Sequence, residues 1–281
     1  MKIYFPLLTS ILFFACQSSP TKVTTKSPET KDTTVHEVSL ADEEGFAFAY
    51  LNFGRDSILC LENEEDSLRQ PAELTLIFAN NESQGIQYLN YKAPTSADNG
   101  RQTAYNFDHA GGQLYSTKKM HTETSHALLA NVAFARKRSI IAVQGVRLPS
   151  LPTRALSNAK WRNREIKENA LVARGKDMEI TVTTFAPVAD TALAVLAFLS
   201  DTKTIYYEMP ALYDEMSTWS VDDGGTFGSD YFNILQAFSY EGKIELLTLK
   251  FTTEGYIMQL LREENNNFKV VKEVYGYSAP L

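Results

Sequence analysis

The densest set of side chains that could bind a charged ligand is basic and lies between residues 136 and 176. Eleven lysines and arginines occur there against two acidic residues, a net charge of +9. The following segment, residues 177–240, has one lysine against ten acidic residues, a net charge of −9. Because the first segment is strongly positive, it could attract an anionic ligand, and the two net charges cancel.

An aromatic residue lies among the arginines of the basic segment. Guanidinium groups bind phosphates and carboxylates through paired hydrogen bonds, and an indole ring offers a stacking surface. We therefore predict a site for an anionic ligand, such as a phosphorylated lipid head group or an acidic glycan, or for an acidic protein. The candidate binding residues are Arg136, Lys137, Arg138, Trp161, Arg162 and Arg164. The alternative is that these side chains are solvated or pair with the acidic segment inside one fold.

The histidines do not predict a metal site. His121 and His126 are five residues apart, so they would face opposite sides of a strand. The segment from Asp222 to Asp230 has three acidic residues and three glycines, but their order does not match a calcium-binding EF-hand loop. We interpret it as an acidic turn between strands.

Catalytic residues and cofactors are not predicted either. The sequence lacks a Gly-x-Ser-x-Gly nucleophile motif, a phosphate-binding loop that ends in Lys-Ser/Thr, and a Gly-x-Gly-x-x-Gly motif. Carboxylate pairs of glycoside hydrolases meet only in the fold, so a hydrolase stays an alternative. The net charge of −7 argues against nucleic acid as a partner, because such binding needs a cationic surface.

The N-terminus resembles the signal segment of bacterial lipoprotein precursors. One lysine, Lys2, precedes an apolar run too short to span a bilayer, and Leu12-Phe13-Phe14-Ala15-Cys16 is similar to the lipobox of that family. The departures from the family pattern are Phe13, Phe14 and the single positive charge. The resemblance implies that residues 1–15 are removed and that Cys16 carries the lipid.

Several acyl chains on one residue hold a protein stably at a membrane. We therefore expect a membrane partner through the lipid anchor and a location in the cell envelope, at the outer membrane. The sequence has two cysteines, so lipidation of Cys16 would exclude a disulfide within the chain. The apolar neighbours of Cys60 in the sequence predict that Cys60 is buried.

Composition divides the rest of the chain into a tether and a globular part. Residues 16–44 are rich in Ser, Thr, Lys, Pro and Glu and cannot bury enough apolar surface to fold. Residues 45–281 are long enough for one domain or two subdomains. Short alternating segments dominate them, so we expect a mainly β fold, an antiparallel sandwich or barrel with one or two short helices, with an α+β fold as the alternative.

The clearest predicted strands are residues 243–251, 256–262 and 268–274, which are joined by polar turns as in a hairpin meander. Other predicted strands include residues 46–50, 74–79, 86–91, 103–107, 114–117, 178–185 and 204–208. Prolines favour helices over residues 154–170 and 210–218. Residues 127–135 and 192–199 are rich in alanine, and their periodicity fits either a helix or a strand.

These observations favour a lipid-anchored envelope protein with a binding or assembly role and no chemistry of its own. The alternatives are an anchored hydrolase of glycan or peptide and an envelope inhibitor or immunity lipoprotein. A deep cleft with converging acidic groups would favour the hydrolase. A shallow exposed patch would favour the binder or the inhibitor.

Overall fold

The structure is a computed structural model that describes residues 44–61, 71–151, 156, 160–161, 163–217 and 220–278. The chain divides by its contacts into two units, Met1–Glu37 and Val38–Leu281, and all described residues belong to the second. The expected signal segment, Cys16 and nearly all of the expected tether lie outside the described residues. So does Arg162.

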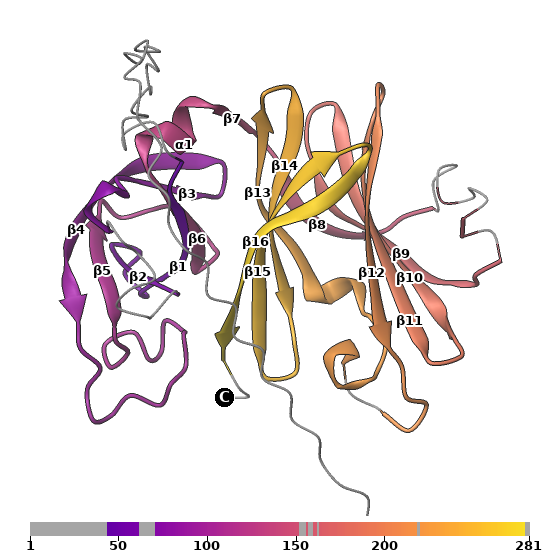
Figure 1. Cartoon of the computed structure of the whole chain (residues 1–281), viewed down its shortest axis with the longest axis horizontal. Coiled ribbons are helices and arrows are strands. Elements are labelled where there is room, and N and C mark those ends of the chain that lie inside the picture. Colours follow the sequence, from indigo (N-terminus) through magenta and orange to yellow (C-terminus); the bar gives the residue numbers. More distant parts are fainter. Residues whose placement is uncertain are drawn as a thin grey trace, which may run out of the picture. The chain divides into compact units, whose positions relative to one another are not determined.

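The described chain is mainly β, as predicted, and forms a closed barrel and a curled sheet (Figure 1). The barrel has six strands in the order β1-β2-β5-β4-β3-β6. Their bounds are β1 Phe46–Leu51, β2 Ser57–Cys60, β3 Leu76–Ala79, β4 Glu82–Lys92, β5 Gly112–Thr117 and β6 His126–Ala130. Small and branched side chains such as Ala47, Ala49 and Ile77 fill the interior together with Cys60, whose predicted burial is confirmed.

The curled sheet has ten strands in the order β7-β13-β14-β15-β16-β12-β11-β10-β9-β8. Their bounds are β7 Arg138–Ile141, β8 Gln144–Pro149, β9 Ile166–Arg174, β10 Met178–Val188, β11 Thr191–Ser200, β12 Thr204–Leu212, β13 Phe232–Tyr240, β14 Lys243–Phe251, β15 Gly255–Glu264 and β16 Asn267–Tyr277. All pairings are antiparallel except the single bridge between Tyr206 of β12 and Asn267 of β16.

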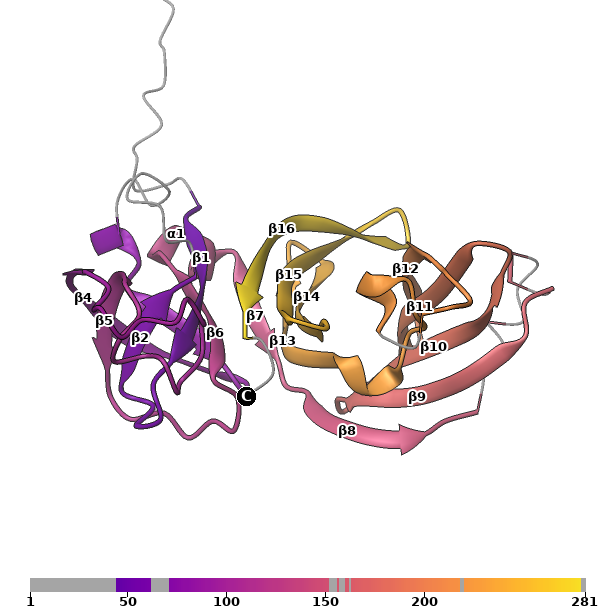
Figure 2. The same cartoon turned by 90° about the horizontal axis from the view of Figure 1, so that it is seen from below.

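The curl makes two halves of this sheet face each other across an interior (Figure 2). One apolar cluster fills that interior with side chains from both halves, including Ile180 and Leu196 from one half and Phe232 and Leu246 from the other. Buried apolar residues of the connection between β12 and β13 join the same cluster. That connection therefore covers part of the interior of the curled sheet. It also forms one wall of the site described below.

A second cluster joins the barrel to the sheet. It includes Phe48 and Phe78 from the barrel and Phe238, Leu247 and Met258 from the sheet. Because barrel and sheet bury side chains against each other, their contact contributes to the hydrophobic stability of both.

The helices predicted over residues 154–170 and 210–218 are wrong where the structure describes them. Residues 166–170, predicted to end a helix, form the start of β9 and pair with β10. Residues 210–212, predicted to begin another, continue β12. In both places the pairing with neighbouring strands overrides the local preference of the sequence. The predicted strand at 103–107 is also wrong, because these residues form turns.

The ambiguous segment at residues 127–135 contains both kinds of structure, the strand β6 and then the helix α1, Val132–Arg136. Asn131 begins the helix, because its side chain accepts a hydrogen bond from the Phe134 N–H. Residues 192–199 belong to the strand β11. None of the helices in the described residues is long and apolar enough to cross a membrane.

Candidate functional site

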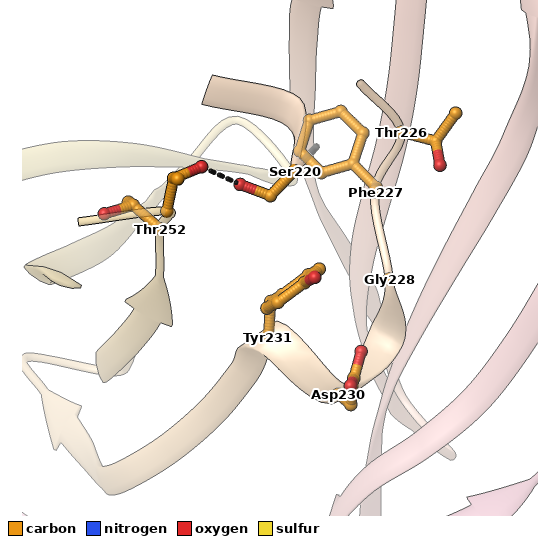
Figure 3. Close-up of a pocket in the computed structure, with 8 residues that line it drawn as sticks. Ser220, Thr226, Phe227, Gly228, Asp230, Tyr231 and Thr252 are labelled. Atoms are coloured by element: carbon orange, nitrogen blue, oxygen red, sulfur yellow. Dashed lines mark hydrogen bonds between the residues drawn. The ribbon is translucent and has the colours of Figure 1, made fainter. Parts of the chain in front are cut away.

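The candidate site is an opening of about 500 Å³ between the β12–β13 connection and the turn that joins β14 to β15. Its lining combines hydroxyl groups, two aromatic rings and one carboxylate (Figure 3). The lining residues are Ser220, Thr226, Phe227, Gly228, Asp230, Tyr231, Thr252 and Thr253. A cavity of this size suits a small ligand or one unit of a polymer.

Buried apolar side chains fix the β12–β13 connection to the interior of the sheet. Val221, in the 3-10 turn η3 (Val221–Asp223), and Phe227 are both less than a tenth exposed. Phe227 stacks on Phe232 with ring centroids 6.2 Å apart. In the chain between Val221 and Phe227, Gly224 has a φ of 82°, a left-handed conformation that glycine adopts without strain.

Hydrogen bonds attach the same connection to the β14–β15 turn. The Ser220 and Thr253 hydroxyl oxygens are 2.8 Å apart, and the Thr253 N–H donates to the Asp222 carboxylate over 2.9 Å. The Ser220 hydroxyl also donates to Asp222. Burial by itself would raise the pKa of Asp222, but these hydrogen bonds hold its pKa below the usual value. Asp222 therefore fastens the two walls of the opening while it is ionised.

The 3-10 turn η4, Ser229–Tyr231, presents Asp230 and Tyr231 to the opening. Glu168 of β9 accepts hydrogen bonds from both the backbone N–H and the hydroxyl of Ser229. Arg147 of β8 donates to the carbonyl oxygens of Ser229 and Phe232 over 3.2 and 3.4 Å. Two charged side chains thus hold the turn from the strand side.

Gly228 allows Asp230 and Tyr231 to lie close to the backbone. A Cβ atom at position 228 would lie 2.5 Å from Asp230 Oδ1 and 3.1 Å from Tyr231 Cε2. Figure 3 shows the Phe227 and Tyr231 rings at the top and bottom of the opening, with Ser220 and Thr252 to one side and Thr226 and Asp230 to the other.

Three polar groups in this lining make no hydrogen bond within the described part of the chain. They are the Thr226 hydroxyl, the Asp230 carboxylate and the Tyr231 hydroxyl. The other hydroxyls of the lining are engaged, since Thr252 accepts from the Gly255 N–H over 3.0 Å. The opening therefore has both a fixed frame and groups that remain available to a ligand.

Lys250, near the end of β14, lies within the electrostatic reach of Asp222 beside the opening. Burial lowers the pKa of Lys250, against the attraction of Asp222 and Glu273. The carboxylate of Glu273 accepts a hydrogen bond from the Gln259 side chain over 2.9 Å. The acidic groups near the opening are thus balanced in part by a half-buried cation.

The residues predicted to bind an anion lie in two places. Arg136, Lys137 and Arg138 are at the end of α1 and the start of β7, and Trp161 and Arg164 are in the connection between β8 and β9. The Arg138 side chain is 1% exposed and contacts Glu44 and Glu245 at 2.8 and 2.6 Å. Lys137 contacts Glu44 at 2.8 Å, while Arg136 is exposed.

Trp161 is buried and packs edge-on against Tyr206, with ring centroids 4.9 Å apart. Neither the Trp161 indole N–H nor the buried Nη1 of Arg164 has a hydrogen-bond partner among the described residues. The binding of an anion near Trp161 and Arg164 stays a prediction. Arg138, by contrast, is occupied by its ion pairs with Glu44 and Glu245 inside the fold.

Some basic residues pair with the acidic segment, as the alternative interpretation of the charge pattern expects. Arg174 contacts Glu179 at 2.9 Å, and Lys160 contacts Glu208. In the described residues no group of three or more His, Cys, Asp or Glu side chains could hold a metal ion.

Sequence reasoning did not select Thr226, Tyr231 or Thr252. It noted the segment 222–230 only as an acidic turn, and the structure confirms that this segment connects two strands. The signal that could have found the site is the sequence Thr226-Phe227-Gly228, in which an aromatic residue lies between a hydroxyl and a glycine.

A scan against protein-family models and searches of curated proteins and of solved structures find no match to this chain.

Proposed function

We propose that this chain is a lipid-anchored protein of the cell envelope with a binding role, and that it binds through the opening described above. The lipobox-like Leu12-Phe13-Phe14-Ala15-Cys16 supports the anchor, with Cys16 as the lipidated residue. The anchor would hold the β-rich unit at the outer membrane through a tether.

One observation supports the binding role above the others. The opening presents a hydroxyl, a carboxylate and a phenol without internal partners on a frame that Glu168, Arg147 and Asp222 fix. A fixed frame lowers the entropy lost when a ligand binds, since its contact groups are already ordered. A site prepared in this way is more useful for binding than for packing the chain.

The anchor is tested by fractionation of cells that produce the wild-type chain or Cys16→Ser. We expect the wild-type protein in the detergent phase and Cys16→Ser in the aqueous phase, because the serine cannot carry a thioether-linked lipid. Cys60→Ser is the control, and we expect it to stay in the detergent phase. Detergent partitioning of Cys16→Ser would contradict the anchor.

The binding role is tested with a photo-crosslinking amino acid at position 226 of the full chain in cells. We expect a discrete adduct there and none from position 87, which is exposed on β4 of the barrel. Equal labelling from both positions would contradict binding at the opening.

A further inference from the structure

The chemistry of the opening indicates which class of ligand it takes. We propose that it binds an uncharged pyranose, as a free oligosaccharide or as one unit of a surface polysaccharide. This inference rests on the proposed binding function and adds the ligand class to it.

The accessible aromatic ring of Tyr231 suits one face of a sugar. An aromatic face carries partial negative charge, and the C–H bonds of a pyranose face carry partial positive charge. The Tyr231 ring is half-buried and its edge lies against Gly228, so it is held in place without a ligand. Phe227 is fixed by its stack on Phe232. A flat, saturated ring would stack on the accessible part of Tyr231, whereas Phe227, which is 8% exposed, adds only a small apolar surface to the wall of the opening.

The free polar groups suit the hydroxyls of a sugar. The Asp230 carboxylate can accept two hydrogen bonds from neighbouring hydroxyls, and hydrogen bonds to an ionised group are stronger than neutral ones. The Thr226 and Tyr231 hydroxyls can both donate and accept, as sugar hydroxyls do. The lining offers more hydrogen-bond acceptors than groups that can only donate. A ligand with many O–H donors, such as a sugar, can fill these acceptors.

The charge around the opening favours a neutral ligand over a charged one. The Asp230 carboxylate at the rim would repel an anion. In the β12–β13 connection, Asp222 already accepts hydrogen bonds from Ser220 and Thr253, and Lys250 lies within its electrostatic reach. A cation would therefore meet one available carboxylate and the opposing charge of Lys250.

The experiment uses the full lipidated chain in detergent micelles. It is first screened against neutral oligosaccharides of glucose, galactose, mannose and N-acetylglucosamine, and the best probe is then titrated by calorimetry. Asp230→Asn removes the charge, and Tyr231→Ala removes the lower ring. We expect each to weaken binding about tenfold or more, since a charge-assisted hydrogen bond or an aromatic contact is lost.

Matched variants separate the site from general effects. Asp201→Asn removes a carboxylate from an exposed turn, and Tyr91→Ala removes a tyrosine that is 42% exposed on the barrel. We expect both to bind like the wild type. Equal circular dichroism spectra and melting temperatures for all variants show that a loss of binding is not a loss of folding.

The two sources of the sugar are distinguished by the probe. If the ligand is a free oligosaccharide, we expect soluble probes to bind at least as tightly as the same sugar inside an insoluble polysaccharide. If the ligand is a polymer unit, we expect the wild-type protein to sediment with the polysaccharide and Asp230→Asn to stay in solution. Either result supports the pyranose.

Absence of binding to every neutral sugar would overturn the inference. So would a charged probe, such as glycerol phosphate or spermidine, that binds more tightly and is released by salt. Neither result bears on the anchor, which depends on the fractionation of Cys16→Ser. A sugar recovered in shortened form would support the ligand class and replace the binding role with hydrolysis.

Discussion

The side-chain amide of Asn81 pairs with both backbone groups of Val143. Its Nδ2 donates to the Val143 carbonyl over 2.6 Å, and its Oδ1 accepts from the Val143 N–H over 2.9 Å. Asn81 lies at the tip of the β3–β4 hairpin of the barrel, and Val143 lies where β7 ends and β8 begins. The Asn81 amide thus makes the two hydrogen bonds with Val143, between β7 and β8, that a neighbouring strand would otherwise make.

Asn81→Ala should lower the free energy of unfolding by about 1–3 kcal/mol, because both Val143 groups lose their partner. The matched control is Asn80→Ala. Both asparagines have positive φ, 52° for Asn80 and 64° for Asn81, so both variants bear a similar backbone strain. Within the described part of the chain, the Asn80 side chain makes one exposed hydrogen bond of 3.3 Å, to the His121 carbonyl. Equal effects of the two variants in urea denaturation would contradict a special role for Asn81.

Arg138→Met should destabilise the chain by about 3–5 kcal/mol, since it leaves part of a buried carboxylate uncompensated. Glu245 is fully buried and receives Arg138 and Arg262, each at 2.6 Å. Arg136→Met is the control, because Arg136 is exposed and its loss should change the unfolding free energy by less than about 0.5 kcal/mol. Chemical denaturation measures both, and a small effect of Arg138→Met would show that Arg262 suffices for Glu245.

The stability of the fold should fall between pH 6.5 and pH 4 because of His126. Burial and then the nearby Arg55 lower its pKa from 6.5 to about 4. In this range the unfolded chain binds a proton at His126 and the folded chain does not, so stability that is complete above pH 6.5 is lost as the pH falls. The loss at this residue reaches about 3 kcal/mol near pH 4.

His126→Phe keeps a ring beside Tyr256, whose centroid is 4.3 Å from that of His126. The variant should lose this part of the pH dependence while other titrating groups remain. Denaturation at several pH values checks it by the difference between wild type and variant. A difference that stays constant from pH 7 to pH 4 would show that His126 does not titrate as described.

The predicted anion site has its own test. Arg162→Glu with Arg164→Glu should weaken retention on an anionic matrix in a salt-sensitive way, because salt screens the attraction between a protein and a charged matrix. Lys176→Glu with Lys269→Glu makes the same change in net charge at other places and should retain the protein more strongly. Equal retention of the two double variants across a salt series would leave only a net-charge effect.

The sequence predicts the local hairpins of this fold well. The bounds of β14, Lys243–Phe251, follow from alternation and from the turn at Thr252, and Asn265 and Asn266 both adopt the positive φ that a tight hairpin needs. Such features depend on neighbouring residues. They can therefore be inferred without knowledge of distant contacts.

Contacts between distant segments explain what the sequence did not reveal. Prolines suggested a helix over residues 154–170, yet residues 166–170 begin the strand β9 because they pair with β10, and Ala170 also pairs with β8. The site combines Asp230 and Tyr231 with Thr252 of another turn, and Glu168 and Arg147 support it from strands far away in sequence. The sequence Thr226-Phe227-Gly228 marks one wall of the site, but no local pattern shows which distant residues lie beside it.

Gly228→Ala tests whether the position of Asp230 and Tyr231 matters for binding. The backbone at position 228 has φ −109° and ψ 144°, which alanine adopts without strain, so the fold should keep its stability within about 0.5 kcal/mol. The added Cβ would meet Asp230 Oδ1 at 2.5 Å and must displace the carboxylate or the Tyr231 ring. We expect sugar binding to weaken severalfold by calorimetry, whereas Gly145→Ala, which meets no atom within 4 Å, should bind like the wild type. Unchanged binding by Gly228→Ala would mean that the ligand does not depend on the close packing of Asp230 and Tyr231 against the backbone.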